Sequence, residues 1–119
     1  MDIKGIQREL RQFALERDWE QFHSPKNLAI ALAVEAAELL ERFQWLTEDQ
    51  SARLAELEGD YAAVVEEMAD VMIYLLRLAD RLDIDLEAAV PDKIRKNAAK
   101  YPVDLARGNA VKYNRRTAR

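Results

Sequence analysis

Apolar residues recur at helical spacing along most of the chain. Over residues 2–17 they stand three and four positions apart, a pattern typical of an amphipathic helix. The aromatic stretch that follows, residues 18–23, lacks this period and predicts a loop. Ser24 and Pro25 then predict the start of a second helix, because serine caps a helix and proline is favoured in its first turn. We expect this helix to reach about Trp45.

The middle of the chain predicts a short helix followed by a long one. Thr47 and Gln50 stand at the spacing of a capping box, so a short helix should begin there and end near Gly59. Asp60 is expected to cap a long fourth helix that ends near Leu82.

A last helix is expected from about residue 86 to Lys100. The residue before a proline disfavours helical geometry, so Pro102 should end this helix. Pro91 lies inside the expected helix and should kink it or delay its start.

The composition fits one all-α domain. The chain has 119 residues, the size of one domain, and three Gly and three Pro are too few for the many turns of an all-β protein. We expect an all-α domain over residues 1–102 and a basic tail over residues 103–119. The longest apolar run, residues 71–76, is far shorter than the ~20 residues of a membrane helix, and no signal-peptide pattern is seen. We therefore expect a cytoplasmic protein with no membrane partner.

Charge is distributed unevenly along the chain. The net charge is −4, from 18 basic and 22 acidic residues. Acidic residues gather in the second and fourth predicted helices, whereas the chain from residue 93 onward is basic. Its basic residues are Lys93, Arg95, Lys96, Lys100, Arg107, Lys112, Arg115, Arg116 and Arg119. The chain has no cysteine and one histidine, His23, which excludes disulfides, thiol nucleophiles and most histidine-ligated metal sites.

Two carboxylate pairs lie on helices that are otherwise apolar nearly all round. Such helices belong in a core or an oligomer interface. Glu35 and Glu38 share one helix face, as do Glu67 and Asp70, although Glu66 is an alternative partner for Asp70. Neither pair has a base at the spacing that would relieve the repulsion, so a divalent cation would offset the cost of bringing the pairs together. A ligand set made of oxygen alone favours Mg²⁺ or Mn²⁺.

Magnesium bound by carboxylates usually also binds substrate phosphates. The basic segment from residue 93 onward could then bind the same phosphates. Lys93, Lys96 and Lys100 stand at helical spacing, with Asn97 beside them, and are candidates to hold phosphates. Aromatic residues are candidates to sandwich a nucleobase: Trp19, Phe22, Trp45 and Tyr74.

The two acidic pairs, Glu35-x-x-Glu38 and Glu67-x-x-Asp70, resemble the signature of the all-α nucleotide pyrophosphohydrolases, the MazG-like superfamily. Three further segments resemble its dCTP pyrophosphatase branch: residues 16–28, residues 43–45 and residues 100–108. The resemblance implies a four- or five-helix bundle that assembles as a dimer of dimers, a homotetramer or homodimer, with sites at subunit interfaces.

The resemblance also implies an activity, namely Mg²⁺-dependent hydrolysis of a nucleoside triphosphate to the monophosphate and pyrophosphate. The expected substrate is dCTP or a related pyrimidine deoxynucleotide. The matching metal ligands are Glu35, Glu38, Glu67 and Asp70, and Glu38 and Glu41 are alternative general bases. The matching substrate contacts are Trp19, Glu20, Gln21, Phe22, His23, Trp45, Tyr74, Lys93, Asn97 and Tyr101. Leu10 stands where relatives of this branch carry a histidine, which puts cytosine selectivity in question.

Three other functions compete with this interpretation. A non-enzymatic helical oligomerisation or interaction module would leave the acidic stripes exposed. A ferritin-like oxidase needs Glu-x-x-His pairs, and this chain carries Glu38 and Asp70 where those histidines would stand. Nucleic-acid binding is disfavoured by the acidic body and by a basic tail without interleaved aromatic residues.

Overall fold

The computed structural model describes residues 1–115, which form helices and turns without a strand. The all-α prediction is confirmed for this part of the chain. There are two compact units, Met1–Ile84 and Asp85–Arg119. The first unit contains α1 (Ile3–Glu16), η1 (Glu20–Phe22), α2 (Pro25–Glu41), α3 (Glu48–Ala52), η2 (Leu54–Glu56) and α4 (Glu58–Arg81). The second contains α5 (Leu86–Lys100), α6 (Val103–Ala106) and η3 (Tyr113–Arg115).

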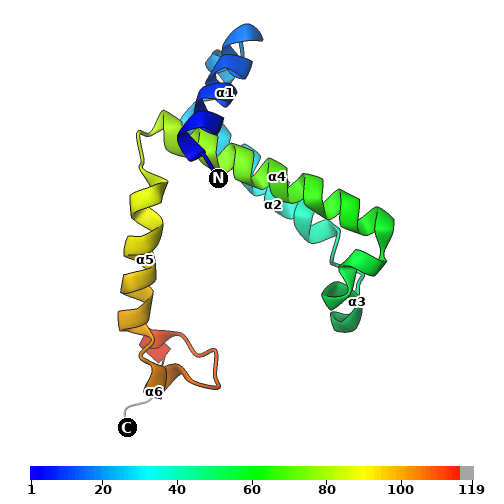
Figure 1. Ribbon diagram of the computed structural model, residues 1–119, viewed down its shortest axis with the longest axis vertical. Coiled ribbons are helices and arrows are strands. Elements are labelled where there is room, and N and C mark those ends of the chain that lie inside the picture. Colours follow the sequence, from blue (N-terminus) through cyan, green and yellow to red (C-terminus); the bar gives the residue numbers. More distant parts are fainter. Residues whose placement is uncertain (116–119) are drawn as a thin grey trace. The chain divides into compact units, whose positions relative to one another are not determined.

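Helices α2 and α4 run side by side in opposite directions and form the body of the first unit (Figure 1). Helix α1 packs on the C-terminal half of α4, where Gln7 Nε2 donates to the Leu76 carbonyl at 3.0 Å. Arg11 Nε lies 2.8 Å from Asp80 and adds an ion pair to the same contact. The buried apolar residues are Ala14, Leu28, Val64, Leu76 and Ala79.

Helices α1 and α4 end in the same way, in a Schellman motif with aspartate in the left-handed conformation. After α1, Asp18 has φ 54°, and the Trp19 N–H donates to the Ala14 carbonyl at 2.9 Å. After α4, Asp83 has φ 55°, and the Ile84 N–H donates to the Ala79 carbonyl at 2.8 Å. The first of these turns directs the chain into the aromatic segment before α2.

The predicted start of the second helix is confirmed, but its predicted end is wrong. The Ser24 hydroxyl accepts from the Asn27 N–H at 3.1 Å, and Pro25 is the first residue of α2. The helix ends at Glu41 rather than near Trp45, and residues 42–46 form a turn. Apolar residues continue the helical spacing past the true end, so the pattern alone carries no stop signal there.

The third helix is also shorter than expected, and the cap of the fourth differs. Thr47 and Gln50 form the predicted capping box, but α3 ends at Ala52. Helix α4 begins at Glu58 with Leu57 at its N-cap and no side-chain cap, so the prediction that Asp60 caps it is wrong. Asp60 lies in the first turn, where a negative charge favours the helix dipole instead.

In the second unit, α5 begins at Leu86 after the Asp85 carboxylate, which accepts from the Ala88 N–H at 3.3 Å. Pro91 lies inside α5 and does not delay its start. The Tyr113 ring packs edge-on against Tyr101, with centroids 6.2 Å apart. The domain boundary expected at residue 102 stays a prediction. Arg116 and Arg119 of the expected basic tail lie outside the described residues.

Much of the apolar surface of α2 and α4 is left open by a single chain. Large apolar side chains at least one third exposed are Ile30, Val34 and Leu40 on α2, and Tyr61, Val65, Met68, Met72, Ile73 and Leu75 on α4. The expected burial of both helices therefore does not occur within one chain. Separately, no helix within residues 1–115 is long and apolar enough to cross a membrane.

Candidate functional site

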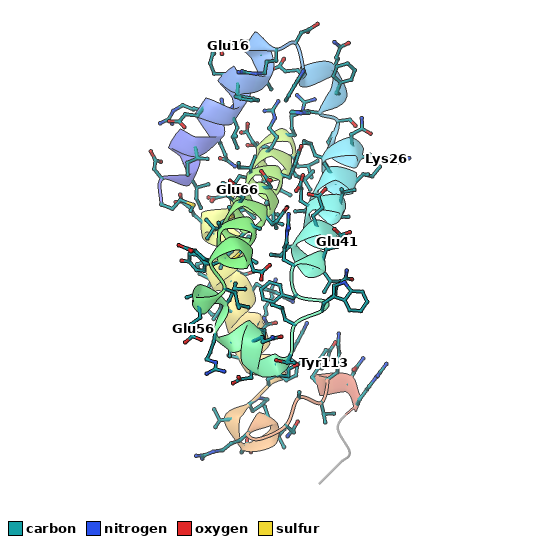
Figure 2. The ribbon with its side chains drawn as sticks, turned by 90° about the vertical axis from the view of Figure 1, so that its right-hand side faces the viewer. Glu16, Lys26, Glu41, Glu56, Glu66 and Tyr113 are labelled. Atoms are coloured by element: carbon teal, nitrogen blue, oxygen red, sulfur yellow. The ribbon has the colours of Figure 1, made fainter. Side chains whose placement is uncertain are left out.

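The facing sides of α2 and α4 bring three carboxylates together. One oxygen from each of Glu35, Glu38 and Glu67 lies within 4.8 Å of the other two. We call these three residues the acidic cluster. Figure 2 shows α2 beside α4, with Lys26 and Glu41 near the two ends of α2 and Glu66 on α4. Within residues 1–115 the cluster includes Glu67 and not Glu66.

The cluster strongly disfavours the ionised form of Glu35. Burial, a side-chain hydrogen bond with Glu38 and the charges of Glu38, Asp70 and Glu67 raise the pKa of Glu35 from 4.5 to about 7. Close like charges make ionisation costly, because each added carboxylate repels the others in a poorly hydrated space. The repulsion that the sequence predicted between the two acidic pairs is therefore present in the folded chain.

Two oxygens of the acidic cluster also lack a partner. Glu35 Oε2 and Glu67 Oε2 are buried and accept no hydrogen bond from any residue in the described part of the chain. Buried acceptors without donors are rare in folded proteins, since each loses its hydration without compensation. Unpartnered carboxylate oxygens from two facing helices fit a hard divalent cation such as Mg²⁺ or Mn²⁺. Glu35, Glu38 and Glu67 are close enough together that they could hold such an ion.

One cation approaches the acidic cluster, contrary to the sequence-based expectation. Arg42 Nη2 lies 3.5 Å from Glu67 Oε1 and bridges the end of α2 to α4. The Arg42 side chain is 46% exposed, so solvent screens this ion pair. The expectation that no base relieves the acidic repulsion was wrong, because Arg42 reaches Glu67 on the opposite helix.

Asp70 lies beside the acidic cluster without being one of its three members. Its charge contributes to the raised pKa of Glu35 and also to that of Tyr74, whose pKa is raised first by burial. Tyr74 therefore keeps its phenolic proton and can both donate and accept a hydrogen bond. Asp70 also lines the cavity described next, so it lies between the acidic cluster and that cavity.

A cavity of about 340 Å³ opens between α1, α4 and the segment before α2. Its walls are mostly aromatic and aliphatic. The lining residues are Leu10, Phe13, Trp19, His23, Asp70, Ile73, Tyr74 and Arg77. A concave, mainly apolar space with a few polar groups is the usual form of a small-molecule site.

Aromatic contacts hold Trp19 and His23, the cavity-lining residues that lie between α1 and α2. The Trp19 ring packs edge-on against Phe13, with centroids 5.7 Å apart, and against His23, with centroids 6.2 Å apart. Burial, together with the charges of Arg77 and Arg81, lowers the pKa of His23 from its usual 6.5. His23 is therefore a neutral imidazole at pH 7.

Several predicted site residues lie elsewhere in the first unit. Glu41 is exposed at the end of α2 and is not part of the acidic cluster. Glu20, Gln21 and Phe22 are exposed and do not line the cavity, and the Gln21 amide is engaged by the Asp18 carbonyl and carboxylate. Trp45 is 87% exposed in the turn after α2.

The remaining predicted residues lie in the second unit. Lys93 and Asn97 lie on α5, and Tyr101 follows that helix. The two units are described separately, so contact between these three residues and the nucleotide stays a prediction.

The cavity contains residues that sequence reasoning did not assign to the site. Phe13 was visible only as an apolar position of the first helix, and Ile73 only as one of the fourth. Arg77 lies seven residues after Asp70, on the same face of the fourth helix, and this spacing is the one sequence signal that points to it. Leu10, noted as a departure from related sequences, also lines the cavity.

Comparison with known proteins yields relatives in both sequence and structure. Rat dCTP pyrophosphatase 1 is 47% identical over 111 residues, and human dCTP pyrophosphatase 1 is 45% identical over 111 residues. The match covers 93% of this chain, which spans 65% of the length of each relative.

The structural match and the family match agree with these relatives. A crystal structure of a pyrophosphatase from Archaeoglobus fulgidus superposes with a TM-score of 0.78 at 42% identity, covering 86% of this chain and 94% of that one. The MazG-like family model matches residues 30–115, which include Glu35, Glu38, Glu67 and Asp70. On these grounds the chain belongs to the MazG-like family.

Proposed function

We propose that this chain hydrolyses a nucleoside triphosphate to the monophosphate and pyrophosphate, with dCTP or a related pyrimidine deoxynucleotide as the substrate. The pair of unpartnered carboxylate oxygens, Glu35 Oε2 and Glu67 Oε2, carries this proposal, because they need a cation and lie next to an apolar cavity. The names of the mammalian relatives favour dCTP, and 47% identity supports the same chemistry. The cytoplasmic location expected from the sequence is compatible with a nucleotide substrate. That location stays a prediction.

Glu35, Glu38, Glu67 and Asp70 would hold Mg²⁺, with Mn²⁺ as a substitute. When bound, this ion would neutralise phosphate charge and make a water molecule more acidic. In return, its charge would favour the ionised form of Glu35, whose pKa is raised in the protein alone. The four carboxylates would therefore be ordered by the same ion that they hold.

The reaction balances with water as the co-reactant. A water oxygen bonds to phosphorus, the bond from that phosphorus to the oxygen bridging the α and β phosphates breaks, and the water proton passes to a carboxylate. Of the two candidate bases, we favour Glu38, which lies in the acidic cluster, over Glu41, which does not. Asp70 and the Tyr74 hydroxyl would orient the nucleotide at the margin between the acidic cluster and the cavity.

The cavity would receive the nucleoside. Trp19 offers an aromatic face, and His23 and Tyr74 offer hydrogen bonds. Contacts of Lys93, Asn97 and Tyr101 with the phosphate and sugar are what the family resemblance predicts. Substrate contacts of Glu20, Gln21 and Phe22, which the family resemblance implies, stay predictions.

We further propose that the active form is a homo-oligomer, a homotetramer or a homodimer. The exposed apolar residues of α2 and α4 support this assembly, because large exposed apolar surfaces on proteins often mark protein interfaces. Trp45, 87% exposed and remote from the cavity lining, would reach a nucleoside site only in a second copy. Light scattering on the purified protein should give two or four times the mass of the chain, and a monomer would contradict the assembly.

Product analysis tests the proposed activity directly. The protein is incubated with Mg²⁺ and each of the common ribonucleoside and deoxyribonucleoside triphosphates, and pyrophosphate and orthophosphate are measured separately. We expect pyrophosphate, with the fastest release from a pyrimidine deoxynucleotide. Orthophosphate alone would contradict cleavage between the α and β phosphates. No product from any nucleotide would favour the non-enzymatic interaction module.

A further inference from the structure

Arg77 is a buried cation whose guanidinium is only partly engaged. The residue is 3% exposed. Nε donates to His23 Nδ1 at 3.4 Å, and Nη1 lies 3.6 Å from Asp80 Oδ2. Nη2 is buried and finds no acceptor within residues 1–115. A buried charged donor without an acceptor is among the most unfavourable groups in a protein interior, so Nη2 calls for a partner from outside the chain.

The ion pair with Asp80 does not account for Arg77. Asp80 already has Arg11 Nε at 2.8 Å, a shorter contact than the 3.6 Å to Arg77. Removing Arg77 would therefore leave Asp80 with a cation. Replacing a buried, partly satisfied charge by an apolar side chain of similar volume is often neutral or stabilising. The ion pair with Asp80 thus gives no folding reason for an arginine at this position.

Arg77 and His23 both line the cavity, and both present hydrogen-bond donors there. Because His23 Nδ1 accepts from Arg77, the proton of the neutral imidazole sits on Nε2, which becomes a donor as well. The aliphatic and phenyl parts of the lining come from Leu10, Phe13 and Ile73, which offer no acceptor to a ligand. A ligand that contacts Arg77, His23 and these apolar residues must have a flat or apolar part and must carry a hydrogen-bond acceptor.

The spacing along α4 fits a nucleotide with its phosphates at the acidic end. Asp70 and Arg77 are seven residues apart, which places them on one helix face about 10 Å apart along the axis. That is about the reach of a nucleoside 5′-phosphate from its phosphate to the far edge of its base. Resting on the proposed function, we propose that Arg77 recognises the nucleobase, with Nη2 donating a hydrogen bond to a ring carbonyl oxygen.

Equilibrium binding of non-hydrolysable nucleotides tests this role apart from catalysis. The full chain with Mg²⁺ is titrated calorimetrically with the α,β-methylene analogues of dCTP, dUTP and dATP, and with inorganic tripolyphosphate. Cytosine and uracil carry a ring carbonyl beside the glycosidic nitrogen, whereas adenine carries none. R77M removes the donor and keeps an apolar chain. R81M is the matched control, because Arg81 lies one turn further along α4, is exposed and does not line the cavity.

For R77M we expect binding of the dCTP and dUTP analogues to weaken about 10- to 100-fold, the loss typical of a buried charge-assisted hydrogen bond. The dATP analogue and tripolyphosphate should change less than about threefold, and R81M should bind all four ligands as the unaltered protein does. The melting temperature of R77M without ligand should stay the same or rise. R77K, which keeps the charge but replaces the guanidinium by an ammonium group, should show the same base-dependent loss if R77M does not fold.

Three results would overturn the assignment. The first is that R77M or R77K binds the dCTP analogue as tightly as the unaltered protein does. The second is that the variant loses as much affinity for tripolyphosphate as for the dCTP analogue, which would indicate a general electrostatic effect. The third is no binding of any nucleotide analogue by the unaltered protein. Pyrophosphate release decides the proposed activity independently, since an active enzyme with an unaffected R77M would refute only the base contact.

Discussion

The acidic cluster and the cavity lie along the same helix, α4, but they leave opposite polar groups without partners. At the cluster the unpartnered atoms are the acceptors Glu35 Oε2 and Glu67 Oε2. At the cavity the unpartnered atom is the donor Arg77 Nη2. The cluster is formed by charged groups, and the cavity is walled mainly by aromatic and aliphatic side chains. Asp70 lies at the margin between them.

This difference indicates that the two regions bind two ends of one ligand. Acceptors without donors need a cation, and a donor without an acceptor needs a carbonyl or a similar oxygen. A magnesium nucleotide supplies both, with the ion and phosphates at one end and the base at the other. Because these three atoms are buried, each destabilises the folded protein while it lacks a partner.

The largest expected effect comes from breaking the acidic cluster. E67Q keeps the shape of the side chain but removes its charge, so pyrophosphate release should fall by about 100-fold or more. The melting temperature without metal should stay the same or rise, because repulsion is relieved. E66Q is the matched control, since Glu66 is the neighbouring exposed residue on α4 and lies outside the cluster. Equal losses in both variants would contradict the assignment of Glu67.

The pKa of Glu35 gives the cluster a pH signature opposite in direction to that of His23 in the cavity, whose pKa is lowered. The pKa of Glu35 is about 7 when folded against 4.5 ordinarily, so the folded state binds more protons between these values. The contribution of Glu35 to metal-free stability is therefore full below about pH 4.5 and is lost as pH rises through about 7. Melting temperatures in a chelator should show this fall, and E35Q should flatten it.

Magnesium should reverse that trend, because it binds the ionised carboxylates. The rise in melting temperature on adding Mg²⁺ should be larger at a pH of about 8 than at about 5.5. A rise that is independent of pH would place the ion away from Glu35.

The smallest effect is expected at Arg42, the cation that approaches the acidic cluster. R42Q removes a positive charge 3.5 Å from Glu67, so Mg²⁺ binding without nucleotide should tighten by about two- to fivefold. Since Arg42 is 46% exposed, metal-free stability should fall by less than about 1 kcal/mol. R53Q removes an exposed arginine that pairs with Asp49 and Glu56 instead, and calorimetry should show unchanged Mg²⁺ affinity for it.

Helix starts were the most predictable feature of the fold. Ser24, Thr47 and Asp85 each accept from a backbone N–H in the first turn of the helix that follows, and such caps are local in sequence. Helix ends were less predictable. Helix α2 stops at Glu41 without glycine or proline. The start of α4 was an exception among the helix starts, because it follows Leu57 without a side-chain cap.

The carboxylates of the site could be predicted, but its arginines could not. Glu35 and Glu38 are spaced on one helix, so their proximity follows from helical geometry. The contact of Arg42 with Glu67 depends on how two helices pack, and the contact of Arg77 with His23 joins residues 54 positions apart. Neither contact leaves a local pattern in the sequence.

A crystal structure of the protein with Mg²⁺ and α,β-methylene dCTP would test both ends of the site at once. We expect the ion about 2.1 Å from carboxylate oxygens of Glu35, Glu38 and Glu67, and the base in the cavity with its carbonyl oxygen on Arg77 Nη2. Carboxylates turned outward into solvent, with the ion bound elsewhere, would contradict the assignment of α2 and α4 as the metal-holding helices.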